Sequence, residues 1–271
     1  PASVHDPISA RIAQQLDFDI GIFAGSVASL TVLGAPDLIL LTLTEFAEQA
    51  MRISRASELP ILVDADHGYG NALNVMRCVQ ELEAAGVAAM SIEDTDLPTV
   101  PGVGGKPQLI SIEAGVGKMR AALAARADSG LVIAGRTSAP AITDVADAIQ
   151  RVCAYEQTGV DALFLVGVKT VADLEAIAGA TTLPMILGGA GKAVKDPELL
   201  RANRVRICLQ GHQPFAAATQ AIYDTMKRLK DGVAPGELPN IAPDQLMNSL
   251  TNQVDYQQWS SQFLDGRDAN D

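Results

Sequence analysis

Three acidic residues follow two apolar runs of the sequence, and together they could hold a divalent metal ion. Asp64 and Asp66 follow the run 61–63, and Glu93 follows the run 88–92. Residues two apart on a strand share a face, and a neighbouring parallel strand could bring Glu93 beside the two aspartates. Hard carboxylate oxygens favour magnesium or manganese over zinc. We therefore predict a metal site at Asp64, Asp66 and Glu93; the alternative is a charge group held by lysines or helix N-termini.

Further residues beside strand ends could bind an anionic substrate next to this site. The Arg136 guanidinium could bind a keto oxygen or a carboxylate, or it could pair with one of the acids. Gly25 and Ser26 lie at a strand-to-helix turn, where free backbone N–H groups bind a carboxylate or form an ordinary cap. His212 follows the last apolar run, where it could donate to a substrate or cap a helix.

Short continuous apolar runs alternate with segments of helical periodicity, as expected for parallel strands that helices cover. The predicted strands are 20–24, 38–41, 61–63, 88–92, 131–134, 162–166, 185–187 and 205–209, and the predicted helices are 44–57, 71–84, 112–125, 142–157, 171–177 and 215–229. About eight strand–helix units in a chain of this length favour an α/β fold of the (β/α)8 TIM-barrel type over a doubly wound sheet.

Two segments fall outside the repeat. Residues 97–109 are rich in glycine and proline, and Gly102 to Gly105 have the freedom expected of a mobile loop over the barrel mouth. We expect a catalytic barrel over residues 1–231, followed over 232–271 by a linker and C-terminal helices. These helices would pack on their own barrel or, exchanged between subunits, on that of a partner.

Composition excludes several kinds of partner. A chain of 271 residues with 48% hydrophobic and 4% aromatic residues is long enough for one large α/β domain with an aliphatic core. The formal net charge of −12 repels nucleic-acid phosphates and anionic lipid surfaces. The three cysteines are widely spaced, and no leader or uncharged run of the ~20 residues needed to span a bilayer is visible. We expect a cytoplasmic protein with a small-molecule ligand and with neither nucleic acid nor membrane as partner.

Five short motifs, in order along the chain, resemble those of the isocitrate lyase and phosphoenolpyruvate mutase superfamily. They are GSVAS at 25–29, GAPD at 34–37, LVDADHGYG at 62–70, SIED at 91–94 and GRTSA at 135–139. Each motif alone is weak, but their order and their spread over most of the barrel make a specific signal. Segments 24–37, 66–77 and 113–118, with Gly211 and His212, most resemble the oxaloacetate decarboxylase branch.

The resemblance implies an α/β barrel, a bound magnesium ion, a 2-oxo acid substrate or product, and a homo-oligomer, often a tetramer built from dimers that exchange their final helix. It implies Asp64 as the direct protein ligand, with Asp66 and Glu93 holding metal-bound waters. Asp37 matches an acid near those waters, although an aspartate after proline is also common in turns. His212 matches a histidine that donates to the leaving carboxylate or to the enolate.

Departures from the superfamily pattern narrow the predicted activity. Lyases of the superfamily carry a Lys-Lys-Cys-Gly-His loop, and Pro101 and Val103 stand here at the Cys and His positions. Loss of that proton-transfer group argues against carbon–carbon cleavage of an isocitrate-like substrate. Two further changes from the decarboxylase branch bear on which substrates the site accepts. Ala190 stands where that branch has a tyrosine, and Ser138 stands where it has an asparagine.

We therefore predict magnesium-dependent decarboxylation of oxaloacetate, or of a close 2-oxo diacid, to pyruvate and CO₂ through an enolate stabilised by the metal and Arg136. The predicted catalytic residues are Arg136, His212 and Asp37, and Gly25 and Ser26 would join Arg136 and His212 in binding the substrate. One alternative is an enzyme acting on a phosphonate, such as phosphonopyruvate hydrolase or a mutase. Others are a carbon–carbon lyase of a 2-methylisocitrate or dimethylmalate type and, in another class, an inactive barrel serving as a binding or assembly module.

Overall fold

Eight parallel strands form one sheet at the centre of the protein. The computed structural model describes residues 1–98 and 107–264. The strands are β1 (Ala2–Ser3), β2 (Gly21–Phe23), β3 (Ile61–Asp64), β4 (Ala89–Glu93), β5 (Val132–Thr137), β6 (Ala162–Val166), β7 (Met185–Gly188) and β8 (Val205–Cys208). Each strand pairs with the next one along the chain, and no ladder joins β8 to β1 within the described residues. The α/β TIM-barrel-like fold predicted from the sequence is confirmed, with its ladder open between the first and last strands.

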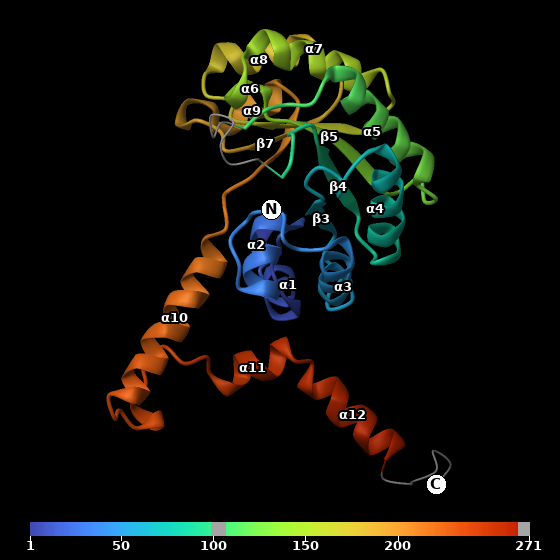
Figure 1. Ribbon diagram of the computed structural model, residues 1–271. Helices are drawn as coiled ribbons and strands as arrows, with labels where there is room; N and C mark the ends of the chain where they lie inside the picture. The colour runs from blue at the N-terminus through green and yellow to red at the C-terminus, as the bar shows by residue number, and fades with distance from the viewer. Residues whose placement is uncertain (99–106, 265–271) are drawn as a thin grey trace. The chain divides into compact units, whose positions relative to one another are not determined.

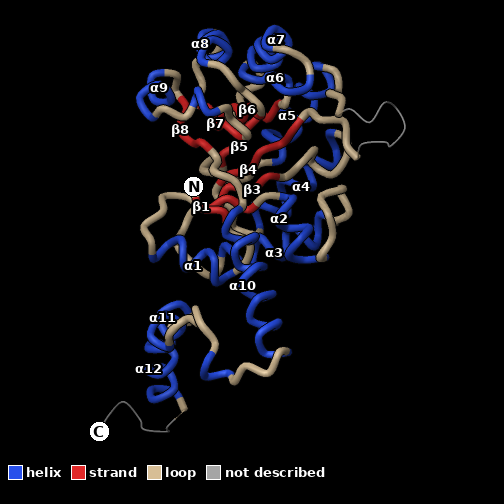
Figure 2. The backbone as a smooth tube through the Cα atoms, turned by 90° about the vertical axis from the view of Figure 1, so that its left-hand side faces the viewer, coloured by secondary structure: helices blue, strands red, loops and turns tan. Residues whose placement is uncertain are grey.

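Helices connect consecutive strands and cover the outer side of the curved sheet (Figures 1 and 2). They are α1 (Pro7–Gln15), α2 (Gly25–Ala28), α3 (Leu43–Ser54), α4 (Ala72–Ala84), α5 (Ile112–Ala125), α6 (Ala139–Ile142), α7 (Val145–Glu156), α8 (Val171–Gly179) and α9 (Pro197–Ala202), with a π-helix η1 (Ser29–Leu33) and a 3₁₀ helix η2 (Lys192–Val194). Polar caps define where several of them begin. The Ser111 and Thr170 hydroxyl oxygens accept hydrogen bonds from the backbone N–H groups of Ala114 and Asp173, which fixes the first turns of α5 and α8.

Two separate apolar layers hold the sheet. The larger lies between strands and helices and includes Phe46, Leu82, Met119 and Leu187, each fully buried. The smaller fills the inner side of the sheet with Ile22, Leu62, Ala89, Ala134, Ala162, Phe164 and Ile186. Alternating residues of each strand supply the two layers, as the period of two requires. The inner layer therefore contains alanines, aliphatic side chains and one aromatic ring, Phe164, beneath a pocket at the strand ends.

One predicted strand is wrong. Residues 38–41 form an irregular loop, in which Ile39 has a left-handed backbone φ of 56°. Leu38 and Leu40 are exposed, and of the run only Leu41 is buried in the outer core. The strand that completes the set of eight is β1, whose two residues are too few for a periodic signal.

The chain folds into two compact units, Pro1–Gln213 and Pro214–Asp271. The second unit holds nearly all of α10 (Gln213–Lys230), a 3₁₀ helix η3 (Pro235–Glu237), α11 (Asp244–Leu250) and α12 (Gln253–Phe263). The expected domain boundary after residue 231 and the exchange of C-terminal helices stay predictions. None of the helices in the described ranges is long and apolar enough to cross a membrane.

The loop predicted to cover the barrel mouth is described only at its two ends. Thr95 and Leu109 form an antiparallel bridge, and the Asp96 N–H donates to the Gln108 carbonyl at 2.8 Å. The positions compared with the lyase loop, Pro101 and Val103, lie outside the described residues, as does the glycine-rich stretch 102–105.

Candidate active site

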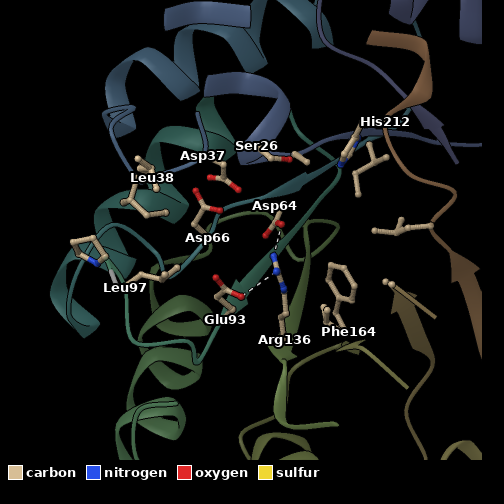
Figure 3. A pocket seen from close by; sticks show the side chains of 18 residues that line it. Ser26, Asp37, Leu38, Asp64, Asp66, Glu93, Leu97, Arg136, Phe164 and His212 are labelled. Atoms are coloured by element: carbon tan, nitrogen blue, oxygen red, sulfur yellow. Dashed lines mark hydrogen bonds and ion pairs between the residues drawn. The ribbon is translucent and has the colours of Figure 1, made fainter. Parts of the chain in front are cut away.

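A pocket of about 510 Å³ lies at the carboxyl ends of the strands. Its lining comes from β2 to β8 and their following loops: Ile22, Ala24, Ser26, Asp37, Leu38, Ile39, Asp64, Asp66, Glu93, Leu97, Pro98, Arg136, Phe164, Val166, Gly188, Gly189, Leu209 and His212. Figure 3 shows four carboxylates on one side and apolar side chains beside Arg136 on the other. This end of the sheet is where barrel enzymes carry their active sites.

Arg136 is the centre of the polar side of the pocket. The β4–β5 register places it directly opposite Glu93, and its Nη2 lies 3.0 Å from Glu93 Oε2. Its Nη1 donates to Asp64 Oδ2 at the end of β3. Two hydroxyl groups also donate hydrogen bonds to these acids: that of Ser91 to Asp64 Oδ1 at 3.1 Å, and that of Thr95 to Glu93 Oε2 at 3.0 Å. The predicted convergence of residues from strands β3, β4 and β5 is therefore present.

Asp66 and Asp37 complete the acidic side of the pocket. Asp66 follows β3 in a left-handed conformation, with φ of 47°, which turns its side chain toward the start of α2. A Cβ added to Gly25 would lie 2.5 Å from Asp66 Oδ2, so only glycine allows this close approach. Figure 3 shows the carboxylates of Asp37 and Asp66 pointing toward each other.

The electrostatics of this group show a deficit of positive charge. Burial raises the pKa of Asp66 well above its usual value, and the charges of Asp64, Glu93 and Asp37 add to that shift. Burial also raises the pKa of Glu93, with Arg136 opposing and Asp64 adding. Burial disfavours the Arg136 cation, but the charges of Asp64 and Glu93 outweigh it and raise the pKa of the guanidinium. One arginine thus leaves the four carboxylates under-neutralised.

The pKa of Asp37 is raised by burial and then by the charge of Asp64. Each of these shifts would be relieved by a cation among the carboxylates. No three acidic, histidine or cysteine side chains in the described ranges converge closely enough to ligate one ion together. Magnesium usually keeps several of its waters and needs few direct carboxylates, so the hard-oxygen donors present fit such an ion.

His212 lies at the opening between the first and last strands. Its Nδ1 lies 2.8 Å from the Oγ of Ser3 on β1, so this contact links the end of β1 to the segment after β8. Burial lowers the pKa of His212, with Asp64 opposing, which favours the neutral ring at neutral pH. When the Ser3 hydroxyl donates to Nδ1, the ring proton resides on Nε2, the nitrogen left to act as a donor. Nothing in the sequence pattern singles out Ser3.

Ser26 lines the pocket at the first turn of α2, as predicted, while Gly25 is buried behind it. The residue that precedes this helix is Ala24, which has no side-chain oxygen to cap the first N–H groups. Those backbone groups are therefore compatible with the predicted binding of a substrate carboxylate, which stays a prediction.

Phe164 is a site residue that sequence reasoning missed. It lies opposite Arg136 in the β5–β6 register, and the Arg136 Cζ is 5.2 Å from the centre of its ring. Gly188 leaves space for that ring, because a Cβ there would lie 2.9 Å from Phe164 Cε2. The guanidinium is thus placed between acids and an aromatic ring, a favourable cation–π arrangement. The only signal in the sequence was an aromatic residue within an aliphatic strand.

His67 belongs to the packing behind the pocket. Its carbonyl accepts a hydrogen bond from the buried Lys118 Nζ at 2.7 Å. Burial, with Lys118 adding, lowers the pKa of the His67 ring to about 4. The buried Nδ1 of that ring has no hydrogen-bond partner in the described part of the chain. His67 therefore supports the loop that carries Asp66.

An α/β barrel with four acids and an arginine in a pocket at its strand ends has the architecture of a barrel enzyme. Residues 2–230 match the phosphoenolpyruvate phosphomutase (PEP mutase) family, and the chain belongs to this family. It is 59% identical over 264 residues to a protein named oxaloacetate decarboxylase from Rhodopseudomonas palustris (strain BisB18), with 97% of this chain and 91% of that protein covered.

Two solved structures show the same fold over nearly the whole chain. Phosphoenolpyruvate phosphomutase from Streptomyces platensis subsp. rosaceus matches with a TM-score of 0.86 and 28% identity, covering 97% of this chain and 93% of that one. Phosphonopyruvate hydrolase in complex with oxalate and Mg²⁺ matches with a TM-score of 0.83 and 27% identity, covering 97% and 93%. These comparisons confirm the superfamily and the decarboxylase branch that the motifs indicated.

Proposed function

We propose that the protein decarboxylates oxaloacetate, or a close 2-oxo diacid, to pyruvate and CO₂ with the help of magnesium or manganese. The observation that carries the proposal is the Asp64–Arg136–Glu93 group beside Asp66 in the pocket at the strand ends. The relative from Rhodopseudomonas palustris named oxaloacetate decarboxylase supports the choice of reaction.

Asp64, Asp66 and Glu93 would hold the divalent cation, and Asp37 would orient water beside it. The cation would supply Lewis-acid stabilisation of the charge that develops on the keto oxygen. Its neighbour Arg136 would stabilise the same charge by hydrogen bonding from a site that excludes most water.

Decarboxylation breaks the C3–C4 bond of the substrate, and the electron pair of that bond passes into the enolate of pyruvate. The departing carboxylate becomes neutral CO₂. Ile22, Val166 and Leu209 form apolar walls in this pocket, and apolar surroundings favour the neutral product over the ion. His212, neutral and oriented by Ser3, would donate a hydrogen bond from Nε2 to the departing carboxylate or to the enolate oxygen, and a proton taken from water at C3 would convert the enolate to pyruvate.

The test is a substrate panel measured with Mg²⁺ and with chelator. The substrates are oxaloacetate, phosphonopyruvate, 2-methylisocitrate and dimethylmalate, and the products measured are pyruvate, phosphate, succinate and propionate. We expect pyruvate from oxaloacetate alone, dependent on the metal. Asp64→Ala should abolish the metal-dependent turnover and keep the circular-dichroism spectrum of a folded protein, whereas Glu175→Ala, which removes an exposed acid of α8, should change neither. Unchanged turnover in Asp64→Ala would refute the ligand assignment.

A phosphonate substrate is the second candidate, favoured by the likeness to phosphoenolpyruvate phosphomutase and to phosphonopyruvate hydrolase. Phosphate release in the same panel would select it. A carbon–carbon lyase would release succinate with pyruvate from 2-methylisocitrate, or propionate with pyruvate from dimethylmalate, and an inactive binding barrel would turn over none of the compounds. We further propose a cytoplasmic setting. We also propose assembly as a dimer or tetramer, and size-exclusion chromatography with light scattering would test this oligomeric state.

A further inference from the structure

A second cavity of about 280 Å³ adjoins the active-site pocket. The two cavities share the lining residues Ile22, Gly189, Leu209 and His212. The second cavity also contacts Lys195, which the first does not. A ligand bound at the acidic side of the pocket could therefore extend past His212 toward an ammonium group.

The backbone holds Lys195 in place at this cavity. Gly189, with φ of 58°, turns the chain after β7, and the Gly191 N–H donates to the Val168 carbonyl at 2.9 Å. The helix η2 that follows ends at Val194, whose side chain is fully buried in the outer core. Lys195 comes directly after this anchor, so its backbone is fixed while its side chain is exposed.

The ammonium of Lys195 is close to the strand ends and uncommitted. Lys195 lines the second cavity together with Leu209 and His212, which follow β8. No ion pair of Lys195 occurs with any residue in the described ranges. Arg136, by contrast, is already paired with Asp64 and Glu93.

The charge balance of the pocket creates a use for this lysine. Four ionised carboxylates and one guanidinium leave the pocket with one negative charge even when a divalent cation is bound. The reacting end of a 2-oxo diacid would be attracted by that cation, but its second carboxylate would meet apolar walls and His212, a neutral ring. Lys195 is the side-chain cation that the joined cavities offer to this second carboxylate.

We propose that Lys195 forms a subsite for the distal carboxylate of the substrate and selects 2-oxo diacids over 2-oxo monoacids. The proposal rests on the proposed function in one respect, namely that the substrate binds with its keto end at the carboxylates of the pocket. Since CO₂ carries no charge, the contact strengthens binding of the intact diacid and does not assist bond breaking. Lys195 is thus a specificity residue.

Steady-state kinetics of Lys195→Met test this role. The KM for oxaloacetate should rise about fivefold, which corresponds to ~1 kcal/mol for a partly exposed ion pair, while kcat should not fall, because the contact is made with the intact diacid and not with CO₂. Lys192→Met is the matched control, because Lys192 begins the short helix that ends just before Lys195, is exposed and lines neither cavity. An equal change in both variants would show a general charge effect and overturn the proposal, as would an unchanged KM in Lys195→Met.

Calorimetric binding in Mg²⁺ separates this proposal from the decarboxylase assignment. The probes are 2-oxoglutarate and 2-oxopentanoate, which share a chain length and differ in a distal carboxylate or methyl group. The wild type should prefer the diacid, and Lys195→Met should remove about fivefold of that preference while leaving the Kd of 2-oxopentanoate unchanged. A wild type without preference for the diacid contradicts the subsite, whatever its activity. A preference that depends on Lys195 in a protein without decarboxylase activity contradicts only the proposed function.

Discussion

Replacing Arg136 by methionine should destabilise the metal-free protein and increase its response to magnesium. The side chain is buried between Asp64 and Glu93 and pairs with both. Removal of one partner from a buried ion pair typically costs about 3–5 kcal/mol, because the remaining charge is left without compensation. For a chain of this size each kcal/mol lowers Tm by roughly 2–4 °C, so we expect a fall of roughly 6–20 °C in chelator.

Magnesium should recover more stability in this variant than in the wild type. With the guanidinium gone, Asp64 and Glu93 lack any competing cation. A ligand that binds only the folded state raises its stability by RT ln(1 + [L]/Kd), so tighter binding of magnesium gives a larger rise. The measurement is thermal unfolding by circular dichroism in chelator and across a magnesium titration. Arg136→Lys is the control, since it keeps the charge while losing the forked geometry.

The decarboxylase activity of Arg136→Met should fall about 10²- to 10³-fold even at saturating magnesium, as for loss of a donor to a developing oxyanion. Two results would refute the reasoning. One is a Tm in chelator equal to that of the wild type, which would mean that the two ion pairs contribute nothing to stability. The other is a magnesium-induced rise smaller than that of the wild type, which would place the cation away from Asp64 and Glu93.

Three further variants test the surroundings of the pocket. Burial lowers the pKa of His67 to about 4, so between pH 6.5 and 4 the unfolded chain binds a proton that the folded chain does not, and the free energy of unfolding decreases as the pH falls. Between pH 7 and 5, the free energy of unfolding of His67→Asn should therefore decrease by about 2 kcal/mol less than that of the wild type, as measured by urea unfolding. Gly188→Ala, whose Cβ would lie 2.9 Å from Phe164 Cε2, should cost about 1–3 kcal/mol by the same measurement, and an unchanged midpoint would show that the ring can move freely. Tyr155→Phe removes a hydroxyl that donates to Asp94 Oδ2 at 2.7 Å and should cost about 1–3 kcal/mol; a neutral result would mean that Arg151 alone suffices for Asp94.

The sequence predicts the sheet well where strands are buried on both sides. Seven of the eight strands follow from runs such as 61–63 and 162–166, because residues facing helices and residues facing the barrel interior are both apolar. The run 38–41 shows the limit of that signal. Leu38 and Ile39 line the pocket, Leu40 is exposed and only Leu41 reaches the core, because the backbone is left-handed at Ile39. A run of four leucine and isoleucine residues does not indicate such a backbone.

The acidic side of the site was predictable for the same reason that the sheet was. Parallel strands in chain order bring their ends together, so Asp64 and Glu93 had to meet once their strands were recognised. The opposite side was not predictable, because Phe164, Ser3 and Lys195 acquire their places through register, loop geometry and the turn after β7. None of those features leaves a periodic pattern in the sequence.

The adjacent acids Glu93 and Asp94 lie on opposite sides of the end of β4, where one belongs to the pocket and the other to the packing behind it. Glu93 points into the barrel and pairs with Arg136, whereas the fully buried Asp94 pairs with Arg151 and Tyr155 of α7 on the outer side. Arg151 Nη1 also donates to the Ile110 carbonyl at 3.0 Å, which holds the chain where it returns from the loop after β4. Because the outer carboxylate is fixed by a helix, the inner one is held at a constant position beside Arg136. A mutation of the outer network should therefore alter the geometry of the pocket without touching its lining.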